Sequence, residues 1–427
     1  MVGNFPNLGE VWYNPESIAN ILSLADASKV CRVTMDTTKE RAMCVHRLDG
    51  SVMIFTEHPS GLRVFAGNGF SKDKFITYSM LTTVTDQKKL FSRREINAAD
   101  NARAFYHKLG RPDEAEYQAL LRRQYFRNCP VTADDAKRAL IIYGPGVATL
   151  KGKMTHASAP PRVPTYEAVP IPPSMLEHHQ RVTLCVDFFF AQGHPFFHTI
   201  SRDLGFRTVA AVPDRAHGTI LRELNLVINL YRTRGFIIVG VHSDTEFECI
   251  REDIRPIHLD VVPADCHVGE IERSVKTVKE RLRATVHGLP FKCIPKLLVV
   301  HIVTDAVRCL DQFPWRNGVS DSSPLSLVTG AAAPDNNNMR VELGQYVQVF
   351  EPSDPTNTPK ARSLSAIALT PTSNASGDYY FLSLATGARI SRHQWTELPI
   401  TDTCIARVET LAKHERQPLI QARGIVV

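Results

Sequence analysis

An almost unbroken run of β-prone residues at 181–190 (RVTLCVDFFF) constrains the fold more than any other feature of this sequence. Such a run is typical of a strand buried on both faces, and its sheet therefore needs a layer of structure on each side. Further strands are predicted at 196–200, 207–212, 236–241 and 256–262, and helices at 219–232, 268–285 and 296–310. This order predicts an α/β fold, in which helices cover a mixed five-stranded sheet.

The chain is too long for one ordinary domain, since it has 427 residues, of which 43% are hydrophobic. A proline-rich stretch at 158–173 disfavours both helix and central strand, and it predicts an extended spacer between domains. The divisions that we expect are a β-rich region at 1–70, a helical region at 71–157, a proline-rich linker at 158–178, the α/β core at 179–313, and a C-terminal region with a small β module at 314–427.

The formal net charge of +6 suits a polyanionic partner, but it would equally suit many enzymes that never contact nucleic acid. The nine cysteines form no CxxC pair and no tight cluster, which indicates reduced thiols in the cytosol or nucleus. No export signal is visible, and no apolar stretch approaches the roughly 20 residues that cross a bilayer. We therefore expect a protein that is neither secreted nor inserted in a membrane.

Two acidic residues lie beside strands that the sequence predicts to be buried. Asp187 interrupts the apolar run at 181–190, and Asp244 follows the strand at 236–241. An ionised carboxylate in such a place is costly unless it is paired, hydrogen-bonded or bound to a metal ion. Taken alone, each could equally be a strand-end residue or a turn cap.

A third carboxylate lies on the helix predicted at 268–285. Apolar residues there step by four, three and four positions, which makes one core-facing stripe: Ile271, Val275, Val278 and Leu282. Charged residues follow the same steps one position further on: Glu272, Lys276, Lys279 and Arg283. This pattern fits a metal-dependent enzyme that acts on DNA, and it also fits an ordinary solvated helix face.

Helix geometry distinguishes the two glutamates at the start of this helix. Glu270 and Glu272 are two residues apart, so their side chains point about 200° apart and cannot both face the same site. Glu272 shares a face with Lys276 and Lys279. In the first turn, Glu270 is favoured simply by the positive end of the helix dipole. We therefore expect Glu272 to complete the site.

The order of these motifs resembles the catalytic core of retroviral-type integrases, and in particular that of copia-like retrotransposon polyproteins. That family has motifs of the form D-N-G-x-E-F and N-G-x-x-E-R where this chain has SDTEF at 243–247 and GEIER at 269–273. Four further segments are similar in the expected order: VWYNP and IANILSL at 11–24 to the end of the protease, YHKLGRP at 106–112 to the pre-integrase region, and SPLSLVTG at 323–330 and SRHQW at 391–395 to the C-terminal region.

The resemblance implies an RNase H-like core and a DNA-integrating enzyme. Asp187, Asp244 and Glu272 would hold two magnesium or manganese ions, and would serve both end processing and strand transfer. The implied contacts to phosphate are Lys276, Lys279 and Arg283. The implied partners are double-stranded DNA, both element ends and target, and further copies of the chain. The implied location is the nucleus or a cytoplasmic virus-like particle.

The sequence also departs from the family pattern. Asp244 is followed directly by Thr245 and Glu246 without the Asn-Gly of the motif, and the interval to Glu272 is shorter than usual. In the pre-integrase region Arg111 stands where a second histidine would follow His107, and Cys129 has no nearby cysteine, so we expect no bound zinc. A catalytically inactive relic that binds nucleic acid, or an unrelated α/β enzyme, therefore stays an alternative.

Overall fold

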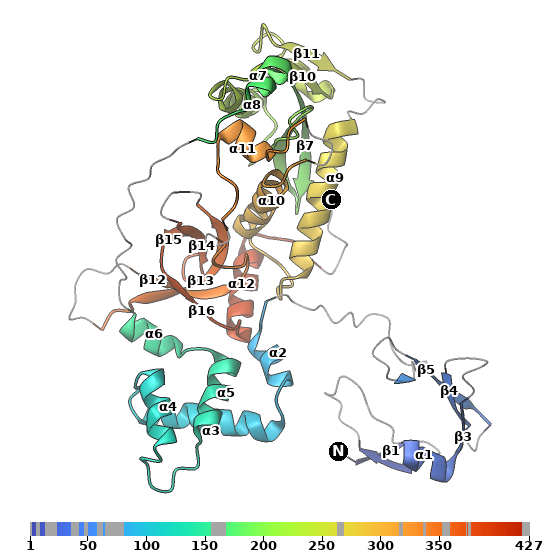
Figure 1. The fold of residues 1–427 in the computed structure, drawn as a ribbon, viewed down its shortest axis with the longest axis vertical. Helices are drawn as coiled ribbons and strands as arrows, with labels where there is room; N and C mark the ends of the chain where they lie inside the picture. The colour runs from blue at the N-terminus through green and yellow to red at the C-terminus, as the bar shows by residue number, and fades with distance from the viewer. Residues whose placement is uncertain are drawn as a thin grey trace. The chain divides into compact units, whose positions relative to one another are not determined.

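The computed structural model of the protein describes residues 2–5, 9–12, 24–35, 42–46, 50–57, 63–64, 81–154, 168–262, 269–315, 319–335, 339–351, 359–372, 374 and 377–420. The chain divides into two compact units, Met1–Ile76 and Thr77–Val427, and each is described by itself (Figure 1). Residues 158–167 of the predicted proline-rich linker and most of the motifs at 11–24 lie outside the described residues.

The first unit is β-rich. A short antiparallel pair joins β1 (Val2–Phe5) to β2 (Gly9–Trp12). After α1 (Leu24–Val30), a four-stranded antiparallel sheet runs in the order β3-β4-β5-β6: Arg32–Met35, Ala42–His46, Val52–Glu57 and Arg63–Val64. Its small core gathers the buried side chains of Ala27, Cys31, Val45 and Met53.

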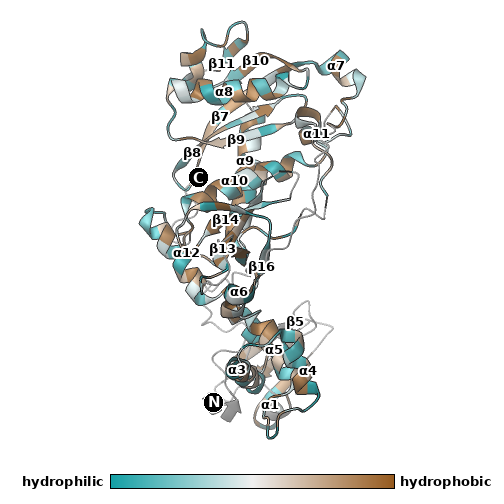
Figure 2. Ribbon diagram, turned by 90° about the vertical axis from the view of Figure 1, so that its left-hand side faces the viewer, coloured by the Kyte–Doolittle hydropathy of each residue, from teal (hydrophilic) through white to brown (hydrophobic). Residues whose placement is uncertain are grey.

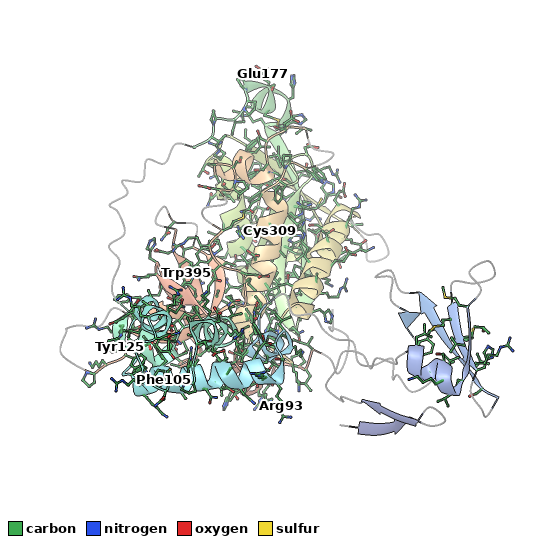
Figure 3. The ribbon with its side chains drawn as sticks, turned by 60° about the horizontal axis from the view of Figure 1, so that its bottom comes forward. Arg93, Phe105, Tyr125, Glu177, Cys309 and Trp395 are labelled. Atoms are coloured by element: carbon green, nitrogen blue, oxygen red, sulfur yellow. The ribbon has the colours of Figure 1, made fainter. Side chains whose placement is uncertain are left out.

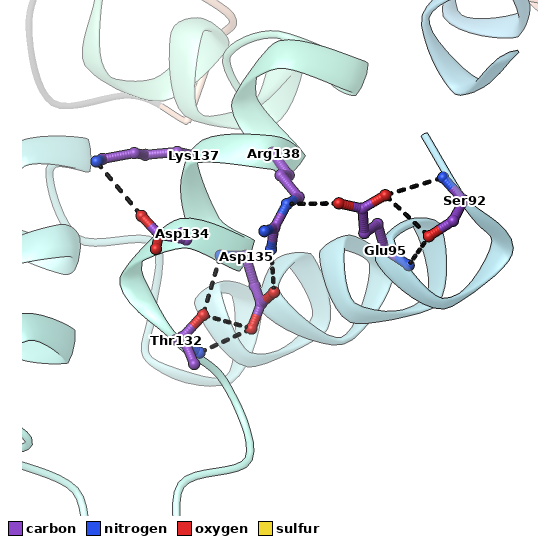
Figure 4. A network of polar contacts seen from close by, with 7 residues as sticks. All are labelled: Ser92, Glu95, Thr132, Asp134, Asp135, Lys137 and Arg138. Atoms are coloured by element: carbon purple, nitrogen blue, oxygen red, sulfur yellow. Dashed lines mark hydrogen bonds and ion pairs between the residues drawn. The ribbon is translucent and has the colours of Figure 1, made fainter. Parts of the chain in front are cut away.

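The second unit begins with five helices: α2 (Val84–Lys89), α3 (Arg93–Lys108), α4 (Glu114–Arg122), α5 (Ala133–Tyr143) and α6 (Val147–Lys153). Capping boxes start α3 at Ser92 and α5 at Thr132, and Arg138 lies within ion-pair distance of the third-position acid of each box (Figure 4). These helices enclose a core of their own, which contains Tyr106 and Tyr117. Phe105 and Tyr125, labelled in Figure 3, both contact the ring of Phe126.

The sheet that carries the candidate site has the strand order β11-β10-β7-β8-β9. Its strands are β7 (Arg181–Ala191), β8 (His194–Ser201), β9 (Arg207–Ala211), β10 (Ile237–Ser243) and β11 (His258–Val261). β10 runs parallel to both β7 and β11, whereas β8 is antiparallel to β7 and β9. The predicted mixed five-stranded sheet is therefore confirmed.

Helices cover both faces of this sheet. The helices of this region are α7 (Pro173–His179), α8 (His217–Arg232), the 3₁₀ helix η1 (Thr245–Ile250), α9 (Gly269–His287), α10 (Lys296–Asp311) and α11 (Pro324–Thr329). α9 and α10 lie side by side against one face, and α8 and η1 share a hydrophobic cluster with the other face (Figure 1). Hydrophobic and hydrophilic residues both occur on α8, as expected of an amphipathic helix (Figure 2).

A second five-stranded sheet, antiparallel throughout, follows in the order β15-β14-β13-β12-β16. Its strands are β12 (Tyr346–Phe350), β13 (Ser363–Pro371), β14 (Tyr379–Ser383), β15 (Arg389–Arg392) and β16 (Trp395–Glu397). An unpredicted helix, α12 (Asp402–His414), comes after it. In the part of the chain that is described, no helix is both long enough and apolar enough to cross a membrane.

Candidate functional site

A β-bulge determines which way the end of strand β10 faces. Ile237 and Ile238 pair with Arg181 and Val182 of β7, but the register shifts before Gly240, which pairs with Thr183. Ile238 and Val241 belong to the same cluster under α8, although an odd spacing along a regular strand would put them on opposite faces. The extra residue, Val239, therefore reverses the alternation of the strand.

The shifted register brings the two aspartates together. His242 pairs with Cys185, so two residues further along the strands Asp244 comes level with Asp187. Cys185 and Phe189 belong to the cluster beneath α9 and α10, which places Asp187, between them, on that same face. Asp187, inside β7, and Asp244, directly after the end of β10, thus lie on neighbouring strands at the same level of the sheet.

The pKa of Asp187 is raised to about 6. Burial is the largest cause, and the negative charges of Asp244, Glu246 and Glu272 raise the pKa further. One stabilising contact opposes these effects, because the backbone N–H of Phe188 donates to Oδ1 of Asp187 at 2.7 Å. Asp187 is therefore the centre of an acidic cluster to which a central strand, a turn and a helix contribute.

The turn after β10 contributes two of these acids. Asp244 is the N-cap of η1, and its Oδ1 accepts a hydrogen bond from the backbone N–H of Glu246 at 3.2 Å. The side chain of Glu246 points to Arg215, whose Nη1 lies 2.8 Å from Oε1. Glu246 lies inside the motif at 243–247, but the motif alone does not indicate its contact with Arg215.

Helix α9 contributes Glu272 and the basic residues. Its predicted apolar stripe is buried, while Glu272 and Lys276 are exposed and Lys279 and Arg283 are half-buried. Burial lowers the pKa of Lys279, and the nearby charge of Asp187 opposes that effect, so Lys279 lies beside the acidic cluster. Glu270 instead makes an ion pair with Arg202 at 3.0 Å.

A buried polar network holds α9 against the sheet. Burial lowers the pKa of His198 to about 4, so its ring is neutral near pH 7. Nδ1 donates to the carbonyl oxygen of Thr208 at 2.8 Å, and Nε2 therefore accepts from the hydroxyl of Ser274, also at 2.8 Å. Arg207 Nε donates to the same hydroxyl oxygen at 3.2 Å, and Nη1 of this arginine pairs with Asp311 of α10.

The acidic cluster has the ligand chemistry of a Mg²⁺ or Mn²⁺ site, because carboxylate oxygens are the donors that hard divalent cations prefer. Among the residues that the structure describes, however, no three His, Cys, Asp or Glu side chains lie close enough together to hold a metal ion. The side chains of Asp244 and Glu272 would have to turn towards Asp187 before one ion could contact all three.

The residues of the candidate zinc site lie on separate parts of the helical region. His107 is in the last turn of α3, where burial lowers its pKa, and Cys129 follows α4 and donates its S–H to the carbonyl oxygen of Val131 at 3.5 Å. The expectation that this region binds no zinc stays a prediction.

The chain matches no known protein-family profile and no curated protein. Among solved structures it is similar to the catalytic core domain of BIV integrase, with 15% identity, a TM-score of 0.26, and coverage of 34% of this chain and 92% of that one. It is also similar to the HTLV-2 integrase catalytic core domain in complex with magnesium, with 15% identity, a TM-score of 0.26, and coverage of 35% and 95%. A likeness of this strength carries no argument for function.

Proposed function

We propose that this chain is a DNA strand-transfer enzyme of the integrase type, with Asp187, Asp244 and Glu272 as its catalytic carboxylates. The observation that carries the proposal is the register of β7 and β10, which brings Asp244 level with Asp187. Burial, together with the charges of Asp244, Glu246 and Glu272, raises the pKa of Asp187 to about 6. A fold accepts such repulsion between buried and neighbouring acids at a cost, and this arrangement is typical of sites that bind a cation.

The sheet topology and the sequence motifs support the same proposal. An RNase H-like core is a mixed five-stranded sheet, here with β7 central and β10 parallel beside it. The two core motifs and the four further segments that are similar to copia-like polyproteins occur in the expected order along the chain. We therefore propose the finer assignment as well, a fragment of a copia-like polyprotein with an RNase H-like core.

In the proposed reaction, a bound pair of Mg²⁺ or Mn²⁺ ions would activate the attacking oxygen and stabilise the leaving oxygen of a phosphodiester. Asp187, Asp244 and Glu272 would hold the ions. Lys276, Lys279 and Arg283, which follow Glu272 along α9, would contact DNA phosphates and position the duplex without reading its sequence. The proposed partners are element ends, target DNA and further copies of the chain, in the nucleus or in a virus-like particle.

A second candidate is a relic that binds DNA but has lost catalysis. It is favoured by the contracted motif at 243–247 and by the separation of the acidic side chains, since no described group of three could hold a metal ion as placed. DNA binding through the basic residues of α9 would survive the loss of the metal site.

A strand-transfer assay with the purified chain and oligonucleotide duplexes separates these functions. We expect products only with Mg²⁺ or Mn²⁺, and none from Asp187→Asn or Glu272→Gln. Glu270→Gln is the matched control, because Glu270 pairs with Arg202 and should cost little activity. DNA binding without products in any metal ion would favour the relic. Absence of both products and DNA binding would leave an unrelated α/β enzyme.

A further inference from the structure

Arg215 lies on the segment between β9 and α8, beside the acidic cluster. Nη1 of its guanidinium contacts both carboxylate oxygens of Glu246, at 2.8 and 3.0 Å. The guanidinium also lies over the ring of Phe190, with Cζ 5.4 Å from the ring centroid. Glu246 is one of the acids that raise the pKa of Asp187, and Phe190 follows Asp187 by three residues on β7. Arg215 therefore stands at the edge of the candidate site.

The segment that carries Arg215 is itself held in place. Oδ1 of Asp214 accepts hydrogen bonds from the backbone N–H of Ala216 at 3.0 Å and from the hydroxyl of Thr219 at 2.6 Å. Thr219 lies in the first turn of α8, so its hydrogen bond to Asp214 fixes the path of the chain into the helix. Nε2 of His217 lies within hydrogen-bond distance, 2.8 Å, of Oδ2 of Asp253, which follows η1. Arg215 thus projects from a segment anchored on both sides.

The guanidinium keeps most of its hydrogen-bonding capacity. Of its three nitrogens, only Nη1 has a hydrogen-bond partner among the described residues, and 46% of the side chain is exposed. A guanidinium carries five N–H donors in a planar fork that matches two oxygens of a phosphate group. Phe190, itself 40% exposed, supports the flat face of this fork. Nε and Nη2 are therefore free to bind a further anion.

A nucleic-acid backbone that approaches the acidic cluster needs a nearby cation to offset the repulsion by the carboxylates. Asp187, Asp244, Glu246 and Glu272 form a negative patch that repels a polyanion over the few ångströms between charges. Lys279 offsets this charge from the α9 side of the sheet. Phe188 lies in the cluster under α8, and Phe190, two residues further along β7, faces the same way. Phe190 and the Arg215 guanidinium over its ring therefore lie on the α8 side of β7, opposite to Lys279. The two cations flank the acids.

We propose that Arg215 binds a phosphodiester group of the DNA substrate next to the acidic cluster, while Glu246 and Phe190 hold its guanidinium in place. This inference rests on the proposed function. It adds a phosphate contact that comes from outside α9 and that the sequence motifs do not include.

Equilibrium binding to a short DNA duplex over a series of salt concentrations tests this contact. Arg215→Ala should weaken binding on the order of tenfold. It should also make the plot of log affinity against log salt less steep, by about one unit of slope. Arg222→Ala is the matched control, because Arg222 lies on the exposed face of α8 and pairs with its neighbour Glu223. The control should leave both affinity and slope unchanged.

Arg215→Lys separates the effect of positive charge from that of the planar guanidinium geometry. This variant should restore the salt slope of the wild-type chain but not its full affinity, because an ammonium group cannot bind a phosphate through two fixed donors. It also keeps the test decisive if Arg215→Ala does not fold. The inference about Arg215 would be overturned, with the proposed function left standing, by either of two results. The Arg215→Ala variant could bind DNA with the affinity and salt slope of the wild-type chain, or the Arg215→Lys variant could keep full affinity. A wild-type chain that does not bind DNA would overturn the proposed function itself.

Discussion

At the scale of single residues, Asp187 is where this fold holds an unfavourable charge. Its side chain is partly buried, and the charges of Asp244, Glu246 and Glu272 raise its pKa in the same direction as burial. A carboxyl group with a raised pKa in the folded state binds its proton more tightly there than in the unfolded chain. The ionised form therefore destabilises the fold, and the penalty grows as the pH rises from about 4, near the unfolded pKa, to about 6.

Replacing Asp187 with Asn should remove this penalty. At pH 7 we expect Asp187→Asn to raise the free energy of unfolding by about 1–3 kcal/mol, the order of magnitude of a shift of two pKa units. At pH 4 the two chains should be equally stable, because the wild-type carboxyl group is then protonated in the folded state. Thermal unfolding at both pH values measures the difference.

Asp321→Asn is the control for this comparison, since Asp321 is exposed and should change stability at neither pH. A wild-type chain that is more stable than Asp187→Asn at pH 7 would show that the acidic cluster does not destabilise the fold. If the cluster binds Mg²⁺, the ion should raise the melting temperature of the wild-type chain more than that of Asp187→Asn.

The residues of the candidate site differ in how far the sequence could predict them. Asp187, Asp244 and Glu272 could be singled out because each is an acid beside a predicted strand or on a predicted amphipathic helix. Arg215 and its contact with Glu246 could not, because the two residues come from different segments that only the tertiary fold brings together. Whether Asp187, Asp244 and Glu272 act in catalysis stays a prediction.

At the scale of elements, strand β10 shows what the pattern of apolar residues in a sequence cannot predict, namely the register of a strand. Its apolar run predicted a strand at 236–241, and β10 spans Ile237–Ser243. The bulge at Val239 has no signal in that run, because every residue from 236 to 239 is apolar and fits either face. Pairing with β7 determines the register, and the register in turn determines that Asp244 faces Asp187.

Helix α9 depends on one small polar residue for its position. Ser274 is the α9 partner of His198, and its hydroxyl also accepts from Arg207. Ser274→Ala would leave the buried Nε2 of His198 and Nε of Arg207 without this partner. We expect a loss of about 1–3 kcal/mol in the free energy of unfolding, the cost of buried polar groups left unsatisfied. Urea denaturation measures it.

Thr277→Ala is the matched control on the same helix. The hydroxyl of Thr277 donates to the carbonyl oxygen of Arg273 at the exposed surface, so its removal should change stability by no more than about 0.5 kcal/mol. Equal effects of the two substitutions would mean that the buried network does not fix α9.

At the scale of the whole molecule, the second unit has a core that crosses the predicted boundary between residues 313 and 314. One hydrophobic cluster contains Cys185 and Phe189 of β7, the buried stripe of α9, Ile367 of β13, and Val408 of α12. Polar contacts cross in the same place, since Glu415 accepts from the backbone N–H of Lys296 at the start of α10 and His301 contacts Thr370. The predicted β module is present. Helix α12 was not predicted, although the Thr401 cap and the spacing by four of Cys404, Val408 and Ala412 are local signals of an amphipathic helix. The segments that it packs against are distant in the sequence, and only the tertiary fold brings them together.

Because the core is shared in this way, we expect removal of the C-terminal helix α12 to unfold the sheet that carries the candidate site. A chain that ends at residue 400 would expose the surface covered by four buried residues: Cys404, Val408, Ala412 and Ile420. It would also lose the carboxylate of Glu415 at the positive end of α10. Burial of these side chains and the helix cap together contribute on the order of 5 kcal/mol, which is comparable to the stability of a whole domain.

We therefore expect the chain that ends at residue 400 to lose its cooperative thermal transition and to bind a dye specific for exposed apolar surface. The matched control starts at Thr77 and keeps everything to Val427, which removes the other compact unit and should leave the transition of the second unit intact. A cooperative transition in the chain without α12 would show that the β7 sheet and its helices form an independent domain, as the predicted boundary at 313 implies. Its absence, with the control folded, would show that the core and the C-terminal region fold as one body.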